Sequence, residues 1–427
     1  MLKFGTLLIM SDHESSPVPT HILIVGAGFG GLAAARALSR AGHKEATITL
    51  VSEKPHFEYY PALYRVVTGT SPLQVCIPIS DVLHGTSVEF VVDKIATIDP
   101  SQRMLRGTSG SMYVYDELIL ALGSETTYLN IPGLEKFSFG FKSITEALRL
   151  KRHLHELFVA CTGVRERDTK KKLLHFVVVG GGSSGVELAG ELAVYAKKLA
   201  KEHGVSPDLV TIDLIEAAPR IVPMFSETVS RRLAVRLRAL GVNVYTDRAV
   251  LREHLEEIAV RGMTVKTETV IWTAGVTPNR FYRTIPGAEF DKKGRVIVDE
   301  HLYMKGSENI FVIGDGASTP YSGMAQTAMR EGARAAENTL RAIERKPLLR
   351  YEPKKPYYAV PVGPGWATVI IGPLTLYGFL GWMLRRAADF RYFLSILPFG
   401  KAVTAFRSGK TLCESCVVCA PEGERGA

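Results

Sequence analysis

Two stretches of the chain share one pattern, an apolar β-branched run followed by a glycine turn and a helix-forming segment. Residues 21–35 read HILIVGAGFGGLAAA, and residues 175–190 read HFVVVGGGSSGVELAG. A second apolar run follows each of them, ATITLVSE over residues 46–53 and TIDLIEA over residues 211–217. A strand, a glycine turn, a helix and a second strand begin a parallel α/β unit. The repeat therefore predicts two Rossmann-like α/β units in one chain.

Further apolar runs show how the two units are connected. Alternating positions predict strands over residues 88–99, 111–124, 242–250, 267–276, 295–304 and 308–316. The last strand ends in Gly-Asp and returns the chain to the first unit, so the second unit is inserted within it. We therefore divide the chain into a leader (1–19), a first unit (20–144 and 277–360), an inserted second unit (145–276), a C-terminal region (361–412) and a tail (413–427).

The C-terminal region differs in character from the rest. Residues 365–384 carry no charge, and two arginines follow directly. Residues 361–412 hold six Lys or Arg against one acid, Asp389, a net +5 out of +9 for the whole chain. An apolar body with interleaved aromatic residues and a basic flank is typical of an amphipathic helix at the interface of an anionic membrane. A homodimer interface and a spanning helix of about 20 residues are the alternatives, although glycines and a proline interrupt the segment and WATVII reads as a strand.

Composition narrows the class of protein. Hydrophobic residues make up 46% and charged residues 22%, which excludes a disordered chain, a collagen-like chain and a polytopic membrane protein. The basic charge follows apolar and aromatic residues without a nucleic-acid-binding motif, so we expect no nucleic acid as a partner.

The cysteines and the leader indicate the compartment. Five cysteines, three of them at Cys413, Cys416 and Cys419, do not form a secreted disulfide framework. Three ligands fall short of the four that a zinc or iron–sulfur site takes, so no metal is predicted. The apolar stretch of the leader is too short for a signal peptide. We expect a protein of the cytoplasmic side.

The glycine turns carry the candidate chemistry. Each pairs three glycines with an acid after the next strand: Gly26, Gly28, Gly31 and Glu53 in the first, and Gly180, Gly182, Gly185 and Glu216 in the second. Such glycines permit a tight turn, close approach of the backbone to a pyrophosphate and close helix–strand packing, and the helix N-terminus favours the diphosphate. The acid binds ribose hydroxyls and repels a 2′-phosphate, so the second site should take NAD(H), with Arg220 able to soften that preference. Two dinucleotide sites indicate a held flavin and a diffusing nicotinamide joined by hydride transfer.

These motifs resemble those of the FAD/NAD-dependent pyridine nucleotide-disulfide oxidoreductase superfamily, whose members have two dinucleotide-binding domains, and within it the type II NADH dehydrogenases. The latter are single-subunit NADH:quinone oxidoreductases that pump no protons. The resemblance covers residues 20–340, and more loosely the chain to about residue 410. It rests on VGAGFGGLAAA, PALYRVVTG (61–69), ALGS (121–124), IPG (131–133), VVGGGSSGVELAGEL, IEAAPRI (215–221), WTAGV (272–276), FVIGD (311–315) and AQTA (325–328).

The resemblance implies an FAD-binding domain formed by the first unit and an NADH-binding domain inserted within it. The first glycine turn and Glu53 would hold the adenosine diphosphate part of FAD, and Asp315 would bind its ribityl chain. A helix beginning near Gly323 would point its positive end at the flavin. The further positions that the motifs place at the cofactors are Pro61, Gly123, Gly275, Gly314, Ala325 and Gln326.

The resemblance also implies three catalytic residues. Glu187 would orient the nicotinamide or relay a proton, the alternative being a solvated acid one helical turn from Glu191. Gln326 and Arg330 fall on the family's quinone motif Ala-Gln-x-Ala-x-Gln, in which Arg330 replaces the second glutamine. As i,i+4 partners they would line one tunnel. Arg330 would then stabilise a reduced quinone or exclude an apolar one; otherwise it is a surface arginine.

The absence of cysteines beside the flavin favours electron transfer from the flavin directly to the acceptor. The chain lacks the cysteines that disulfide reductases, flavin peroxidases and sulfide:quinone oxidoreductases carry beside the flavin. We therefore expect a peripheral (monotopic) flavoenzyme on the cytoplasmic face of the cell membrane, in which NADH reduces FAD and FAD reduces a membrane quinone. The alternatives are a reductase with a soluble acceptor such as oxygen or ferredoxin, and a sulfide:quinone-like or apoptosis-inducing-factor-like flavoprotein.

Overall fold

The first of two parallel sheets lies in the N-terminal unit of the computed structural model, which describes residues 19–43 and 45–407. Its strand order is β20-β9-β1-β2-β5. The strands are β1 (Thr20–Val25), β2 (Ala46–Ser52), β5 (Val88–Val92), β9 (Glu117–Leu120) and β20 (Ile310–Val312). Most of the predicted leader and the cysteines of the predicted tail lie outside the described residues.

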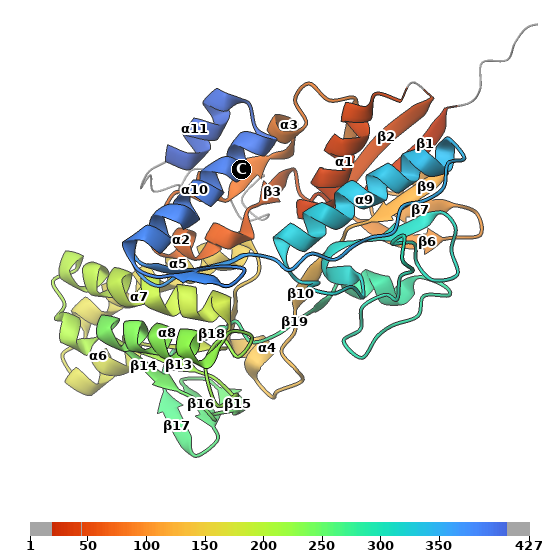
Figure 1. Cartoon of the computed structure of the whole chain (residues 1–427). Helices are drawn as coiled ribbons and strands as arrows, with labels where there is room; N and C mark the ends of the chain where they lie inside the picture. Colours follow the sequence, from red (N-terminus) through yellow and green to blue (C-terminus); the bar gives the residue numbers. More distant parts are fainter. Residues whose placement is uncertain (1–18, 44, 408–427) are drawn as a thin grey trace, which may run out of the picture.

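Both faces of this sheet are covered, which explains the uninterrupted apolar runs. On β1, Ile22 and Ile24 pack into the cluster formed with helices α1 (Phe29–Ala41) and α9 (Ala325–Ile343). Leu23 and Val25 point the other way, toward an antiparallel meander. Helices α1 and α9 lie along each other (Figure 1). A Cβ at Gly332 would overlap the carbonyl oxygen of Gly30, so this close packing requires glycine.

The second parallel sheet is built from the residues between β9 and β20. Its order is β11-β18-β12-β13-β14. The strands are β11 (Phe139–Gly140), β12 (His175–Val179), β13 (Thr211–Ile215), β14 (Val242–Tyr245) and β18 (Thr269–Trp272), and the main helices are α5 (Ile144–Gly163), α7 (Ser183–Glu202) and α8 (Glu227–Leu240). The chain enters and leaves this unit through β10 (Ser124–Thr126) and β19 (Val276–Pro278), which pair antiparallel. The protein therefore has two Rossmann-like units, the second inserted in the first.

Several predicted strands differ from the structure; the run 242–250, for example, is a continuous strand only as far as Tyr245, in β14. The run 88–99 divides into β5 and β6 (Ile95–Asp99), and the run 111–124 divides mainly into β8 (Met112–Val114) and β9. Residues 295–304 form only isolated bridges. Asp299 explains this last difference, because its carboxylate accepts the backbone N–H groups of His301 and Tyr303 and closes a turn within the run.

The C-terminal region begins with a small antiparallel sheet and ends in two helices. The elements are β21 (Tyr358–Pro361), β22 (Ala367–Ile371), β23 (Leu374–Leu376), α10 (Phe379–Ile396) and α11 (Phe399–Arg407). The uncharged segment 365–384 is thus a strand, a hairpin and the start of a helix, and WATVII forms a strand as predicted. None of the helices in the described part of the chain is both long and apolar enough to span a membrane. Figure 1 shows α10 beside α2 (Leu63–Val67) of the first unit.

The remaining elements are short or lie at the edges of the two units. They are β3 (His56–Glu58), β4 (Cys76–Pro78), β7 (Met104–Gly107), β15 (Val250–His254), β16 (Glu257–Val260), β17 (Met263–Lys266), α3 (Ile79–Val82), α4 (Leu134–Phe137) and α6 (Arg167–Leu173).

Candidate active site

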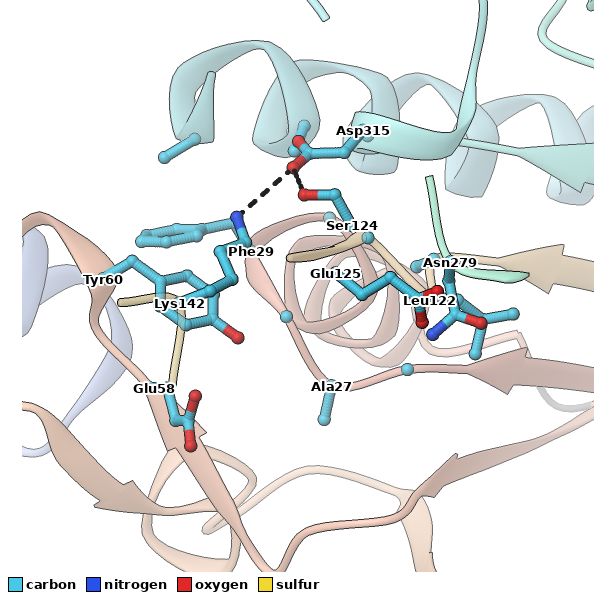
Figure 2. Close-up of a pocket in the computed structure, with 18 of the residues that line it drawn as sticks. Ala27, Phe29, Glu58, Tyr60, Leu122, Ser124, Glu125, Lys142, Asn279 and Asp315 are labelled. Atoms are coloured by element: carbon cyan, nitrogen blue, oxygen red, sulfur yellow. Dashed lines mark hydrogen bonds and ion pairs between the residues drawn. The ribbon is translucent and has the colours of Figure 1, made fainter. Parts of the chain in front are cut away.

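One cavity of about 990 Å³ brings both units and the C-terminal region together. It extends from Glu53, after β2, past the first glycine turn to Arg385 on α10. Ser183 and Ser184, the first residues of α7, line the same space from the inserted unit. Figure 2 shows part of its wall, with Asp315 and Ser124 above, Glu58 below, and Tyr60 and Lys142 between them.

The first glycine turn has the shape that a dinucleotide needs. Gly26 has φ +102°, and a Cβ there would lie 2.5 Å from the carbonyl oxygen of Ala121, so only glycine fits. A Cβ at Gly28 would meet nothing within 4 Å, so the backbone there is open to the cavity. Helix α1 begins directly afterwards at Phe29, with its N–H groups facing this opening. The turn therefore fits the diphosphate of FAD.

The other predicted residues of this site lie nearby. A Cβ at Gly31 would overlap the carbonyl of Gly26, and Gly123 has φ +68° and lines the cavity. Glu53 also lines it, with half of its side chain exposed and its carboxylate 3.3 Å from Lys94 Nζ. A ribose hydroxyl can therefore reach this carboxylate from solvent.

The acid that accompanies the second glycine turn, Glu216, is hydrogen-bonded to the backbone of that turn. Gly180 has φ +111°, and Gly182 is open like its counterpart in the first turn. The carboxylate of Glu216 accepts the backbone N–H of Gly181 (2.6 Å) and that of Ala218 (2.7 Å). These bonds fix a negative charge at the end of β13. Gly185 and Gly275 also pack where a Cβ would clash, Gly185 against the carbonyl of Gly180 and Gly275 against that of Thr127.

Arg220 is not free to soften this charge, contrary to the expectation from sequence. Its guanidinium donates to the carbonyls of Pro223 (2.7 Å) and Phe225 (2.8 Å) and to the hydroxyl of Ser230 (2.7 Å). All three acceptors lie in its own loop or at the start of α8. The arginine therefore holds the loop together instead of facing a 2′-phosphate.

Asp315 stands in the middle of the cavity wall. Its carboxylate accepts the hydroxyl of Ser124 (2.5 Å) and lies 3.7 Å from Lys142 Nζ (Figure 2). The backbone N–H of the preceding Gly314 donates to the buried Glu331 (2.6 Å). Burial raises the pKa of Glu331 to about 7. Glu331 was missed from sequence because nothing in its helix distinguishes it from a surface acid.

Glu187 lines the cavity from α7. Burial raises the pKa of its carboxyl to about 8, although the guanidinium groups of Arg385 and Arg65 oppose the shift. Burial also raises the pKa of Glu191. Glu187 is therefore not the fully solvated helical acid of the alternative, because it lies half-buried in the cavity wall.

The structure separates the two residues of the predicted quinone motif. Ala325 and Gln326, in the first turn of α9, line the cavity. The Gln326 amide bridges the backbone of Tyr357, donating to its carbonyl (2.9 Å) and accepting its N–H (3.2 Å). Arg330 is not among the lining residues and donates to the carbonyl of Lys354 (2.8 Å). Spacing of four along one helix thus does not place both side chains in one tunnel.

Arg385 does line the cavity, although the sequence predicted it only as part of the basic flank of a membrane-binding helix. Arg385 of α10 is buried and donates to Asp389 (2.5 Å) and to the carbonyl of Pro61 (2.6 Å). Its Nε–H has no partner among the described residues. Asp389 is fully buried and also accepts from Tyr59 (2.7 Å) and Arg65 (2.9 Å). The signal in the sequence was an Arg-x3-Asp pair in an otherwise apolar segment.

The outer side of the C-terminal region is apolar. Exposed apolar side chains extend from the β22–β23 hairpin onto the first turns of α10: Ile371, Leu374, Phe379, Leu380, Met383 and Leu384. We call these residues the α10 apolar surface. Those on α10 are spaced i, i+1, i+4 and i+5 and so share one side of the helix. Beside them, the Arg232 guanidinium lies 4.4 Å from the ring centroid of Tyr377.

Comparisons with known proteins agree with this geometry. Residues 20–332 match the family model described as pyridine nucleotide-disulphide oxidoreductase. The chain is 31% identical over 397 residues to a type II NADH:quinone oxidoreductase of Mycobacterium tuberculosis, covering 87% of this chain and 84% of that protein. It is 30% identical to a type II NADH:quinone oxidoreductase of Staphylococcus aureus over 75% of this chain and 82% of that one. The fold is similar to that of NDH2 from Plasmodium falciparum in complex with NADH, with TM-score 0.81, 20% identity and coverage of 91% and 96%.

Proposed function

The chain belongs to the pyridine nucleotide-disulphide oxidoreductase family and, within it, to the type II NADH:quinone oxidoreductases, and from this premise we propose which residues carry its reaction. The protein is an enzyme that uses FAD and NADH and passes electrons from NADH to a quinone without proton pumping. The observation that carries the assignment of residues is the single cavity shared by both units and α10.

The two glycine turns divide the cofactors between them. Gly26, Gly28 and Gly31 hold the diphosphate of FAD at the start of α1, Glu53 holds its adenosine ribose, and Asp315 takes a ribityl hydroxyl. When bound, FAD supplies the acceptor for a hydride and a carrier of two electrons. Gly180, Gly182 and Gly185 present the start of α7 to NADH, where the fixed carboxylate of Glu216 excludes a 2′-phosphate.

The far end of the cavity handles the acceptor. Gln326 lines it with an amide that can donate to a quinone carbonyl, and Arg385 lines it with an unpartnered, buried N–H. Two electrons convert a quinone to a quinol only with two protons. Glu187, with a pKa of about 8, can hold one at neutral pH. We assign charge stabilisation to Arg385 in place of Arg330, whose guanidinium is tied to Lys354 outside the cavity.

A pair of arginine variants tests this assignment. Reduction of the bound flavin by NADH and its reoxidation by a short-chain quinone are followed separately by stopped-flow absorbance. R385M should slow reoxidation at least tenfold, R385K should recover part of the rate, and R330M should match the unaltered enzyme. Equal losses in R385M and R330M, or a loss confined to flavin reduction, would refute the assignment.

We propose that the α10 apolar surface seats the enzyme on the cytoplasmic leaflet of the cell membrane, where NADH is available. Phe379 is 63% exposed and Leu380 53%, which is costly in water and favourable in the lipid interface. Only part of the basic flank faces the lipid, because Arg385 is withdrawn to Asp389. A monotopic attachment brings the cavity close to a lipid-soluble quinone.

Vesicles containing an anionic lipid test the membrane surface. F379E/M383E should abolish co-sedimentation of the enzyme with vesicles of phosphatidylglycerol. L255E is the control, because Leu255 is 73% exposed but lies on the hairpin of the inserted unit. If F379E/M383E instead converts a dimer to a monomer and leaves vesicle binding unchanged, a second copy of the chain covers this surface and the membrane proposal fails.

A further inference from the structure

Lys142 lies within the inserted unit, between its first strand and its first long helix. It follows β11 and precedes α5. Its backbone N–H donates to the carboxylate of Glu146 (2.7 Å), and the hydroxyl of Ser143 accepts the N–H of Glu146 to cap the helix. These bonds fix the main chain at the lysine. The side chain is thereby directed into the cavity, although it comes from the inserted unit.

The ammonium group of Lys142 bridges two walls of that cavity. Nζ lies 3.7 Å from Asp315 Oδ2 and 4.9 Å from the ring centroid of Tyr60. Figure 2 shows it reaching between these two residues, with its contact to Asp315 drawn as a dashed line. About a quarter of the side chain is exposed (27%), so its charge is only partly screened by water.

The other cations that line the cavity are more closely paired. Lys54 Nζ is 2.8 Å from Glu58, Arg280 Nε is 3.0 Å from Glu125, and Arg385 is bound to Asp389. The contact of Lys142 with Asp315 is longer, and Asp315 also accepts the hydroxyl of Ser124. Asp315 therefore neutralises the charge of Lys142 less fully than the other three carboxylates neutralise the charges of their own partners.

From this arrangement we propose that Lys142 sets the reduction potential of the bound FAD. A two-electron reduction adds negative charge to the flavin, and a cation fixed in the same cavity favours the reduced form over the oxidised form. The inference rests on the proposed seat of FAD between Glu53 and Asp315. It adds to that seat a residue of the inserted unit, which lies in neither glycine turn.

The test is an anaerobic redox titration of the FAD-loaded enzyme against a reference dye, with no NADH or quinone present. K142M should shift the reduction equilibrium toward oxidised flavin by roughly tenfold, which for two electrons is ~30 mV to a lower potential. K142R keeps the charge and should stay close to the unaltered enzyme. K94M is the matched control, because Lys94 also lines the cavity and pairs with an acid, but at the adenosine end. Its potential should not move.

Each other outcome counts against the proposal. An unchanged potential in K142M shows that Lys142 does not set the potential, and an equal shift in K142M and K94M shows that position in the cavity does not matter. If K142M and K142Q lose FAD while K142R keeps it, Lys142 retains the cofactor and does not tune it. D315N separates this failure from failure of the seat itself: it should weaken FAD retention whatever Lys142 does, and full retention in D315N would displace the flavin from Asp315.

Discussion

Replacing Asp389 with asparagine removes the charge that joins α10 to the cavity. The carboxylate is fully buried and accepts hydrogen bonds from Tyr59, Arg65 and Arg385. The guanidinium groups of the two arginines are themselves largely buried. In D389N two guanidinium groups remain without a counter-charge. The amide can also present an N–H to a guanidinium group, which can only donate.

The expected cost follows from burial. Breaking a buried ion pair by removing one partner destabilises a protein by about 3–5 kcal/mol, because an uncompensated charge is left behind. An exposed ion pair contributes about 0–1 kcal/mol. Asp81 supplies the comparison: its carboxylate lies 2.5 Å from Lys401 of α11, so it also ties a C-terminal helix to the first unit, but the lysine is 51% exposed. D389N should therefore lower the urea midpoint of unfolding clearly, and D81N hardly at all.

The two half-reactions, flavin reduction and flavin reoxidation, should respond differently to D389N. Without Asp389 the Arg385 guanidinium loses the bond that aims it into the cavity, so flavin reoxidation by quinone should slow while flavin reduction by NADH is kept. Both rates are measured by stopped-flow absorbance at a temperature where D389N remains folded. Equal urea midpoints for D389N and D81N would refute the argument from burial. A D389N enzyme that is unstable but reoxidises normally would refute the link to Arg385.

Further outcomes follow from Glu187, Glu216 and Gly26. The pKa of Glu187 is raised from 4.5 to about 8, so between these pH values the folded state binds more protons than the unfolded state. The free energy of unfolding therefore falls as pH rises through this window. E187Q should remove the part of this fall that Glu187 causes, measured by urea titrations at pH 5 and pH 8. The same variant should flatten the change in quinone turnover around pH 8. E216Q should reduce the preference in kcat/KM for NADH over NADPH about tenfold, and R220M should leave it unchanged if Arg220 only braces its loop. G26A should be isolated without FAD, measured by flavin absorbance, because its Cβ would meet the carbonyl of Ala121.

The sequence pattern was sufficient for those features whose geometry is set by residues close together in the chain. A glycine turn after an apolar strand can be identified from the sequence, since a close approach of backbones demands glycine in any fold. Glu216 was found from its place at the end of the next strand, and the structure ties one of its carboxylate oxygens to the N–H of Gly181 in the glycine turn and the other to the N–H of Ala218 in its own loop. The run 111–124 shows the limit, because alternation alone cannot reveal that one apolar stretch serves two sheets.

The identity of the working arginine could be decided only by tertiary structure. Arg330 and Arg385 each precede an acid on a helix, and their local sequences do not say which one faces the cavity. Arg385 faces it because Asp389 is also bound by Tyr59 and Arg65, residues more than 300 positions away in the chain. The position of Lys142 likewise depends on the packing of the inserted unit against Asp315, 173 residues later. Sequence alone thus determined the two nucleotide-binding turns, because their geometry is set within a few residues, and folding decided which charges meet between them, because electrostatic contacts depend on distance in space.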